Sequence, residues 1–220
     1  MLDFKALLFD LDGTLLDTAP DFITSLNIQL GRHNRAEMPA TEVRAGVTNG
    51  SAGLIRHAFS IDPEHPEFEP LRQEFLDIYY NNLADQTALF DGMHSVLQTC
   101  GQSNIPWGIV TNKPWKYTRA VLEALELLDN ASTIICPDHV QQTKPHPESI
   151  LLACREIDIA PADCIYVGDH LRDIEAGRSA GTRTVAAAWG YISKEDNIAQ
   201  WQADWILSQP THLHPLLFKD

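Results

Sequence analysis

The chain has 220 residues, of which 44% are hydrophobic and 21% are charged, as is ordinary for a globular protein. Its 30 acidic and 16 basic residues give a formal net charge of −14. This balance argues against a nucleic-acid partner, because phosphate backbones are bound through an excess of Lys and Arg. No stretch reaches the roughly 20 apolar residues of a membrane span, and charges interrupt the N-terminal apolar run. We therefore expect a cytoplasmic protein with no signal peptide and no membrane association.

The first apolar segment, residues 4–9, predicts a buried strand and leads directly into Asp10-Leu-Asp12-Gly-Thr. An Asp-Gly pair is also typical of a hairpin turn, but no returning strand follows it. Two carboxylates at the end of a strand suit phosphoryl transfer. Asp10 is then expected to attack phosphorus and form an aspartyl-phosphate, while Asp12 protonates the leaving oxygen and later activates water.

Residues 18 to about 82 show helical patterns and no convincing strand. Thr18 and Asp21 resemble a capping box at the start of a first helix, and further helices are expected over residues 41–59 and 69–83. We therefore assign residues 18–83 to an inserted all-helical cap that determines substrate specificity. Residues 1–17 and 84–220 form the catalytic core, and the cap is expected to lie over its strand ends as a lid.

Apolar segments resume after the insert and alternate with amphipathic helices. This alternation predicts an α/β fold with a doubly wound parallel sheet, which binds ligands at the carboxyl ends of its strands. The four cysteines form no CxxC pair, so we expect buried thiols and no structural zinc. The later predicted strands are residues 107–111, 133–136, 164–168, 184–188 and, more weakly, 204–207.

Further polar groups follow these strands. Thr111 and Asn112 could hold phosphate oxygens, although both residue types also cap helices. Lys144 precedes a proline-started helix, where a fixed ammonium group would neutralise a nucleophile and a phosphate together. Asp169 and Asp173 are four positions apart and would repel each other on one helix face unless a cation lies between them. Carboxylate oxygens suit Mg²⁺, but acids at a helix start also complement the helix dipole.

The whole chain resembles the haloacid dehalogenase-like phosphohydrolase superfamily. DxDGT, Thr111, Lys144 and GDxxxD match its four motifs in order, and the helical insert resembles its C1-type cap. The resemblance implies a Rossmann-like core and a Mg²⁺-dependent phosphatase that acts on a small phosphorylated metabolite. It also implies that Thr111, Asn112 and Lys144 hold the phosphoryl group.

The same resemblance implies roles for the acids. Asp10 is expected to be the nucleophile and a Mg²⁺ ligand, and Asp12 the general acid/base, with its backbone carbonyl as a second ligand. Asp169 is expected to be a third ligand, and Asp173 to support the metal's water shell or the lysine. His170 departs from the pattern, because an acidic residue is expected after the metal aspartate, and its role is open at this point.

Several members of the superfamily fit less well than others. Asp12 argues against a dehalogenase, which lacks the second aspartate, and the absence of lysine from residues 18–82 argues against a phosphonatase, which needs one in its cap. The strings TNKP, ICPDHV and LRDIEAGRSAGTRT resemble those of N-acetylmuramic acid 6-phosphate phosphatases of peptidoglycan recycling. A phosphoglycolate phosphatase is the main alternative, and a sugar-phosphate mutase and a non-catalytic phosphosugar-binding protein stay open.

The cap is expected to choose the substrate, because the core motifs contact phosphate and metal. Its glycine-rich stretch contains Arg44 and Asn49, which are the candidate contacts for a substrate carboxylate or hydroxyl. The alternative is that these glycines only end a helix. The sequence does not indicate the oligomeric state.

Overall fold

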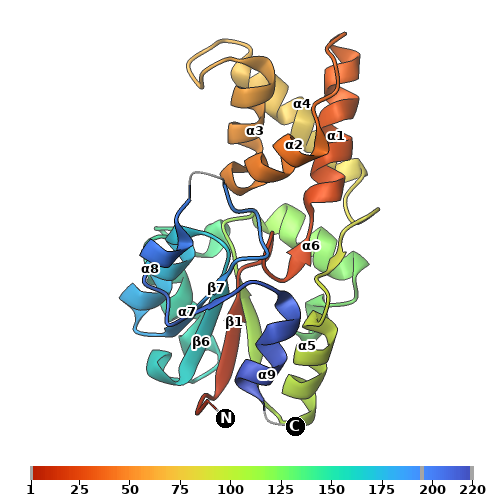
Figure 1. Ribbon diagram of the computed structural model, residues 1–220. Coiled ribbons are helices and arrows are strands. Elements are labelled where there is room, and N and C mark those ends of the chain that lie inside the picture. Colours follow the sequence, from red (N-terminus) through yellow and green to blue (C-terminus); the bar gives the residue numbers. More distant parts are fainter. Residues whose placement is uncertain (1, 194–195, 219–220) are drawn as a thin grey trace. The chain divides into compact units, whose positions relative to one another are not determined.

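The computed structural model describes residues 2–193 and 196–218 and divides into two compact units (Figure 1). Residues Met1–Leu16 and Leu89–Asp220 make up one unit, and Asp17–Ala88 make up the other. The second unit is thus an insertion into the first. The chain crosses between the units at the short strands β2 (Leu16–Asp17) and β3 (Ala88–Leu89).

The first unit is built on a six-stranded sheet in the order β5-β4-β1-β6-β7-β8, and every neighbouring pair is parallel. Every residue of β1, β4 and β6 is buried. Such continuous apolar runs are typical of strands covered on both faces. The strands are β1 (Ala6–Phe9), β4 (Trp107–Val110), β5 (Thr133–Ile135), β6 (Cys164–Gly168), β7 (Arg183–Ala187) and β8 (Trp205–Leu207). All six predicted strands are confirmed.

Helices cover both faces of this sheet (Figure 1). α7 and α8 lie against each other and against strands β4 to β7, while α5, α6 and α9 lie on the other side. Parallel strands need such crossover helices, because a tight turn cannot join them. The helices of this unit are α5 (Met93–Gln102), α6 (Trp115–Ala124), α7 (Glu148–Glu156), α8 (Leu171–Ala180) and α9 (Leu213–Leu217).

The pairing register aligns the ends of the three central strands. Phe9 of β1 lies opposite Ile109 of β4 and Val167 of β6. Because the strands run in the same direction, the residues that follow them emerge together at one edge of the sheet. The register therefore gathers the polar residues that follow each strand.

The second unit is helical: α1 (Ala19–Arg32), α2 (Ala40–Gly46), α3 (Gly50–Phe59) and α4 (Phe68–Asn81). Phe22 of α1 stacks on Tyr79 of α4 with ring centroids 4.2 Å apart, and Phe75 packs beside both rings. Burial of these aromatic rings, with Leu26 and Leu30, supplies the apolar core of the unit.

Two local predictions in this unit were wrong. The single helix expected over residues 41–59 is interrupted by a short 3-10 turn at Val47–Asn49 and by Gly50, whose φ of 64° lies outside the helical range. The capping box is not formed either, because Asp21 accepts hydrogen bonds from the backbone N–H groups of Gln86 and Thr87 and from the Thr87 hydroxyl. Asp21 thus binds a distant loop instead of its own helix end.

All four cysteines are buried free thiols, as expected. Burial raises the pKa of Cys100 to about 12 and that of Cys136 to about 11, which makes both poor nucleophiles at neutral pH. Within the described ranges, no helix combines the length and the apolar character that crossing a membrane requires.

Candidate active site

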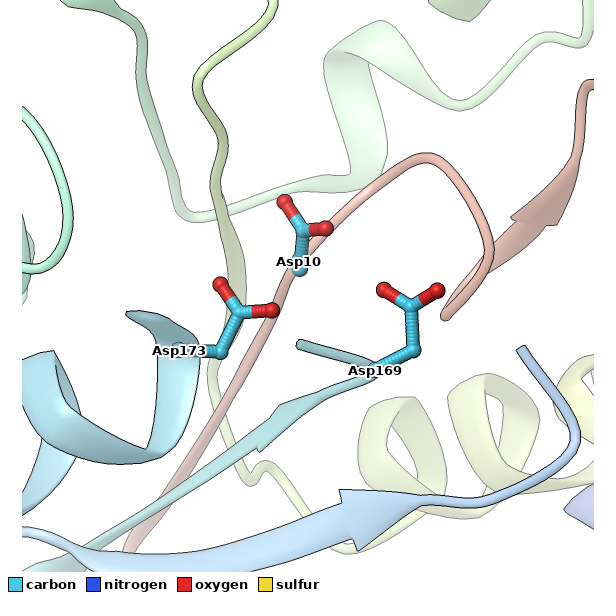
Figure 2. A group of neighbouring side chains, drawn as sticks. All are labelled: Asp10, Asp169 and Asp173. Carbon is cyan, nitrogen blue, oxygen red and sulfur yellow. The ribbon is translucent and has the colours of Figure 1, made fainter. Parts of the chain in front are cut away.

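Three carboxylates lie together at the carboxyl edge of the sheet. Asp10 follows β1, Asp169 follows β6, and Asp173 lies in the first turn of α8. Each offers an oxygen, and these oxygens all lie within 4.8 Å of one another. Figure 2 shows the three carboxyl groups reaching the same region from different elements. The structure therefore brings together residues that the sequence places up to 163 positions apart.

Lys144 provides positive charge beside these acids. Its Nζ lies 2.7 Å from Oδ1 of Asp10 and 2.7 Å from Oδ1 of Asp173. It also donates to the Tyr166 hydroxyl at 2.8 Å and to the backbone carbonyl of Val110 at 2.9 Å. With 1% of its side chain exposed, the ammonium group makes three hydrogen bonds to protein acceptors and an ion pair with Asp173 in place of contacts with water. Burial opposes its charge, but the two carboxylates outweigh this effect and raise the pKa of Lys144.

The charges of this cluster fit a divalent cation. Lys144 contributes one positive charge against the three carboxylates, which leaves an excess of negative charge in a buried place. Burial and the other two carboxylates raise the pKa of Asp169 well above its ordinary value of 3.8. Burial likewise raises the pKa of Asp10. A hard cation with oxygen ligands would offset this repulsion, so the donor set suits Mg²⁺.

Asp169 is held rigidly by its surroundings. Its Oδ1 accepts from the Thr14 hydroxyl at 3.2 Å, and its Oδ2 accepts from the Tyr191 backbone N–H at 2.7 Å. Gly13 and Gly190 pack directly against it: an added Cβ would lie 2.2 Å from Oδ2 of Asp169 at Gly13 and 2.3 Å from its Cβ at Gly190. The chain therefore requires glycine on both sides of this carboxylate. Gly13 also has a φ of 84°, which other residues rarely adopt.

Asp12 lies in the turn after β1 and faces Lys113. The Lys113 Nζ donates to both carboxylate oxygens of Asp12, at 3.0 and 3.2 Å. Asp12 keeps 21% of its side chain exposed, whereas Lys113 keeps 5%. The acid is thus paired with a cation and still reaches solvent.

Thr111 and Asn112 lie at the end of β4, next to these groups. The Thr111 hydroxyl oxygen accepts from the backbone N–H of Lys113 at 3.1 Å. The Asn112 amide donates to the backbone carbonyl of Lys144 at 3.1 Å and so fixes the loop that carries that lysine. Their contacts to a phosphoryl group stay a prediction.

His170 has a structural explanation. It is the N-cap of α8, where its Nδ1 accepts from the backbone N–H of Arg172 at 3.0 Å, while Asp173 accepts from the His170 backbone N–H at 3.0 Å. Burial lowers the pKa of His170 to about 4, so the ring is neutral at pH 7 and its proton resides on Nε2. An imidazole in this position therefore caps the helix that presents Asp173.

Arg44 and Asn49 belong to the helical unit. Arg44 donates through one guanidinium nitrogen to both carboxylate oxygens of Asp17, at 2.9 and 3.0 Å. Asn49 lines a hollow of about 570 Å³ within this unit, together with Arg56 and His57. Neither observation tests whether Arg44 and Asn49 contact a substrate, so this role stays a prediction.

Three residues of the site were missed by sequence reasoning. Lys113 lies two positions after the motif residue Thr111, and the available signal was its place at the end of a predicted strand and not on a solvated helix face. Tyr166 lies inside an apolar strand, where its hydroxyl needed a buried polar partner. The contribution of Tyr191 comes from its backbone N–H, which no side-chain pattern reveals.

Known proteins share this architecture. The model of the family described as haloacid dehalogenase-like hydrolase matches residues 7–187. The N-acetylmuramic acid 6-phosphate phosphatase of Pseudomonas putida is 42% identical over 213 residues, which are 97% of this chain and 96% of that protein. A phosphoglycolate phosphatase of Xylella fastidiosa is 38% identical and is covered to 90%, with 94% of this chain aligned.

A solved structure is similar to this chain over its whole length. The crystal structure of a predicted phosphoglycolate phosphatase from Haemophilus somnus 129PT superposes with a TM-score of 0.86 at 28% sequence identity. The match covers 99% of this chain and 100% of that one. The similarity therefore extends over both units of the chain.

Proposed function

The chain belongs to the haloacid dehalogenase-like hydrolase family, and we propose that it is a Mg²⁺-dependent phosphomonoesterase that forms an aspartyl-phosphate on Asp10. The observation that carries the proposal is the meeting of Asp10, Lys144, Asp169 and Asp173 at one edge of the sheet. A structural ion-pair network would need neither the excess of negative charge nor two glycines packed against Asp169.

The side chains divide the reaction between them. The Asp10 carboxylate forms the bond to phosphorus while the bond to the leaving oxygen breaks, and Asp12 gives that oxygen a proton. Asp12 then takes a proton from water, which attacks phosphorus and releases Asp10 and inorganic phosphate. Lys144 holds Asp10 in place and offsets the charge of the phosphoryl oxygens, which Thr111 and Asn112 help to hold through hydrogen bonds.

The metal would be held by Asp10, Asp169 and the backbone carbonyl of Asp12, with Asp173 in support. When bound, Mg²⁺ would neutralise charge on the phosphoryl group. The chain's own contribution is to hold these carboxylates rigidly, through Thr14, Tyr191 and Lys144, before any cation binds.

We propose N-acetylmuramic acid 6-phosphate as the substrate. The support is the 42% identity to the Pseudomonas putida phosphatase of that name over nearly the full length of both proteins. This substrate would place the protein in the recycling of cell-wall sugars in the cytoplasm. The second candidate is 2-phosphoglycolate, because a protein 38% identical is named a phosphoglycolate phosphatase.

The test compares kcat/KM for N-acetylmuramic acid 6-phosphate and for 2-phosphoglycolate, with Mg²⁺ and with EDTA. We expect phosphate release that requires the metal and favours the sugar phosphate. A preference for phosphoglycolate would reverse the order of the two substrates. Conversion of a sugar phosphate to its isomer without phosphate release would indicate a mutase, and binding without turnover would indicate a phosphosugar-binding protein.

The helical unit is proposed to select the substrate, with Arg44 and Asn49 as its contacts. Both candidate substrates carry a carboxylate, which a guanidinium group binds well. Arg44→Ala is expected to raise KM more than it lowers kcat. Arg35→Ala provides the comparison, because Arg35 lies in the same unit but packs on Phe59. An unchanged KM for Arg44→Ala would exclude this role.

A further inference from the structure

Lys113 makes a two-point contact with the carboxylate of Asp12. Its Nζ lies 3.0 Å from Oδ1 and 3.2 Å from Oδ2, and 5% of the lysine side chain is exposed. A cation shared by both oxygens restricts rotation of the carboxylate about its Cβ–Cγ bond. The contact joins residues 101 positions apart, so it exists only in the folded chain.

The backbone of Lys113 is itself held on both sides. Its N–H donates to the Thr111 hydroxyl at 3.1 Å, and its carbonyl accepts from the Thr118 hydroxyl at 3.1 Å. Thr111 directly follows β4 and Thr118 lies in α6, and both are buried. The lysine therefore projects from a rigid base between a strand and a helix.

The side chain of Asp12 is more exposed than those of Asp10 and Asp173. It lies in a turn, next to Gly13 with its φ of 84°, and 21% of its side chain is exposed. A general acid/base must lie within hydrogen-bond reach of the atom it serves, and small misplacements reduce rates strongly. A partly exposed carboxylate on a turn has several rotamers available, and the two-point contact with Lys113 favours one of them.

We propose that Lys113 is a positioning residue that orients the Asp12 carboxylate toward the leaving oxygen. This inference rests on the proposed function, in which Asp12 is the general acid/base. It adds a residue that the four family motifs of the sequence analysis do not contain. It also gives a role to a lysine that adjoins Thr111 and Asn112 and whose ammonium group donates to Asp12.

The competing explanation is that Lys113 binds the phosphoryl group, as proposed for Lys144. The two roles differ in how they depend on the leaving group. Orientation of a general acid matters most when the leaving group is a poor one, such as a sugar hydroxyl. It matters little for 4-nitrophenolate, which departs without a proton. Binding of the phosphoryl group matters equally for both.

The experiment measures kcat/KM of Lys113→Met for a sugar 6-phosphate and for 4-nitrophenyl phosphate with Mg²⁺, because kcat/KM reports the steps up to loss of the leaving group. We expect a loss of about 10–100-fold for the sugar phosphate and less than about threefold for the aryl ester, within the range of general acid catalysis. Lys113→Arg is expected to restore part of the loss, because its guanidinium group also reaches both oxygens.

A double-mutant cycle with Asp12→Asn gives a second readout. If Lys113 acts through Asp12, Asp12→Asn/Lys113→Met is no slower than Asp12→Asn alone. Equal losses for both substrates, or additive effects in the cycle, would overturn the inference. Near-normal turnover of Asp12→Asn would instead contradict the proposed function, so the two failures are distinguishable.

Lys5→Met is the matched control. Lys5 pairs with Asp163 at 2.8 Å at the amino end of the sheet, so this variant also removes a lysine from a Lys–Asp pair, but an exposed one far from the site. We expect it to keep wild-type kcat/KM for both substrates. Circular dichroism checks folding, and if Lys113→Met does not fold, the arginine variant still tests the inference through the ratio of the two substrates.

Discussion

The Nζ of Lys144 lies 2.7 Å from Oδ1 of Asp10, although the two residues are 134 positions apart in the chain. Asp10 comes from the end of the central strand, and Lys144 comes from a loop anchored by the amide of Asn112. The pair places an ammonium group against the proposed nucleophile before a substrate arrives. Such preorganisation avoids reorganisation at the moment of reaction.

Asp10→Asn is expected to abolish turnover, because an amide cannot form the aspartyl-phosphate. The fold should be retained, since the amide is of similar size and Lys144 keeps Asp173 as a charged partner at 2.7 Å. Phosphate release and a thermal melt measure the two effects. Asp163→Asn, an exposed change at the other end of the sheet, is the control. Near-normal activity of Asp10→Asn would exclude the covalent mechanism.

Metal removal is expected to make stability depend on pH. Burial, with the charges of Asp10 and Asp173, raises the pKa of Asp169 above 3.8, so the folded state binds protons more tightly than the unfolded state. The free energy of unfolding must then fall as pH rises above about 4. Denaturant titrations in EDTA across this range test the sign. Mg²⁺ or Asp169→Asn should weaken the dependence, and a rise of stability with pH in EDTA would contradict the reasoning.

Lys144→Met and Tyr166→Phe should differ strongly. Loss of the ammonium group leaves Asp10 and Asp173 without their shared cation, which costs about 3–5 kcal/mol in the free energy of unfolding. Loss of the Tyr166 hydroxyl costs about 0.5–1.5 kcal/mol, because Lys144 keeps both carboxylates and the Val110 carbonyl as acceptors. Chemical denaturation in EDTA measures both values. Equal losses in the free energy of unfolding for the two variants would show that the charge of Lys144 does not stabilise the cluster.

Gly190→Ala is expected to weaken Mg²⁺ binding. The added Cβ would lie 2.3 Å from Cβ of Asp169 and 2.6 Å from the carbonyl oxygen of Gly13, so the proposed ligand must move. Calorimetric titration with Mg²⁺ measures the effect. Gly101→Ala is the control: nothing lies within 4 Å of its added Cβ, and in helix α5 it should stabilise by about 0.5–1 kcal/mol. Unchanged metal affinity of Gly190→Ala would show that Asp169 is not a ligand.

The sequence by itself determined the strands of the core and the residues that follow them. Short apolar runs identify buried strands, and the polar residues directly behind them, such as Asp10, Thr111 and Asp169, must emerge at one edge of a parallel sheet. This inference needs only local patterns. Local reasoning failed for the capping box predicted at Asp21, because the hydrogen-bond partners of Asp21 lie 65 and 66 positions away, beyond the reach of a local capping rule.

Only the tertiary structure decided which of these groups touch. The pairing of Lys113 with Asp12 joins residues 101 positions apart, and Tyr166 supports Lys144 from inside an apolar strand. The close packing of Gly190 on Asp169 depends on how a later loop returns to the sheet. Such contacts depend on distances of a few ångströms between segments remote in the chain, and residue types in order do not encode those distances locally.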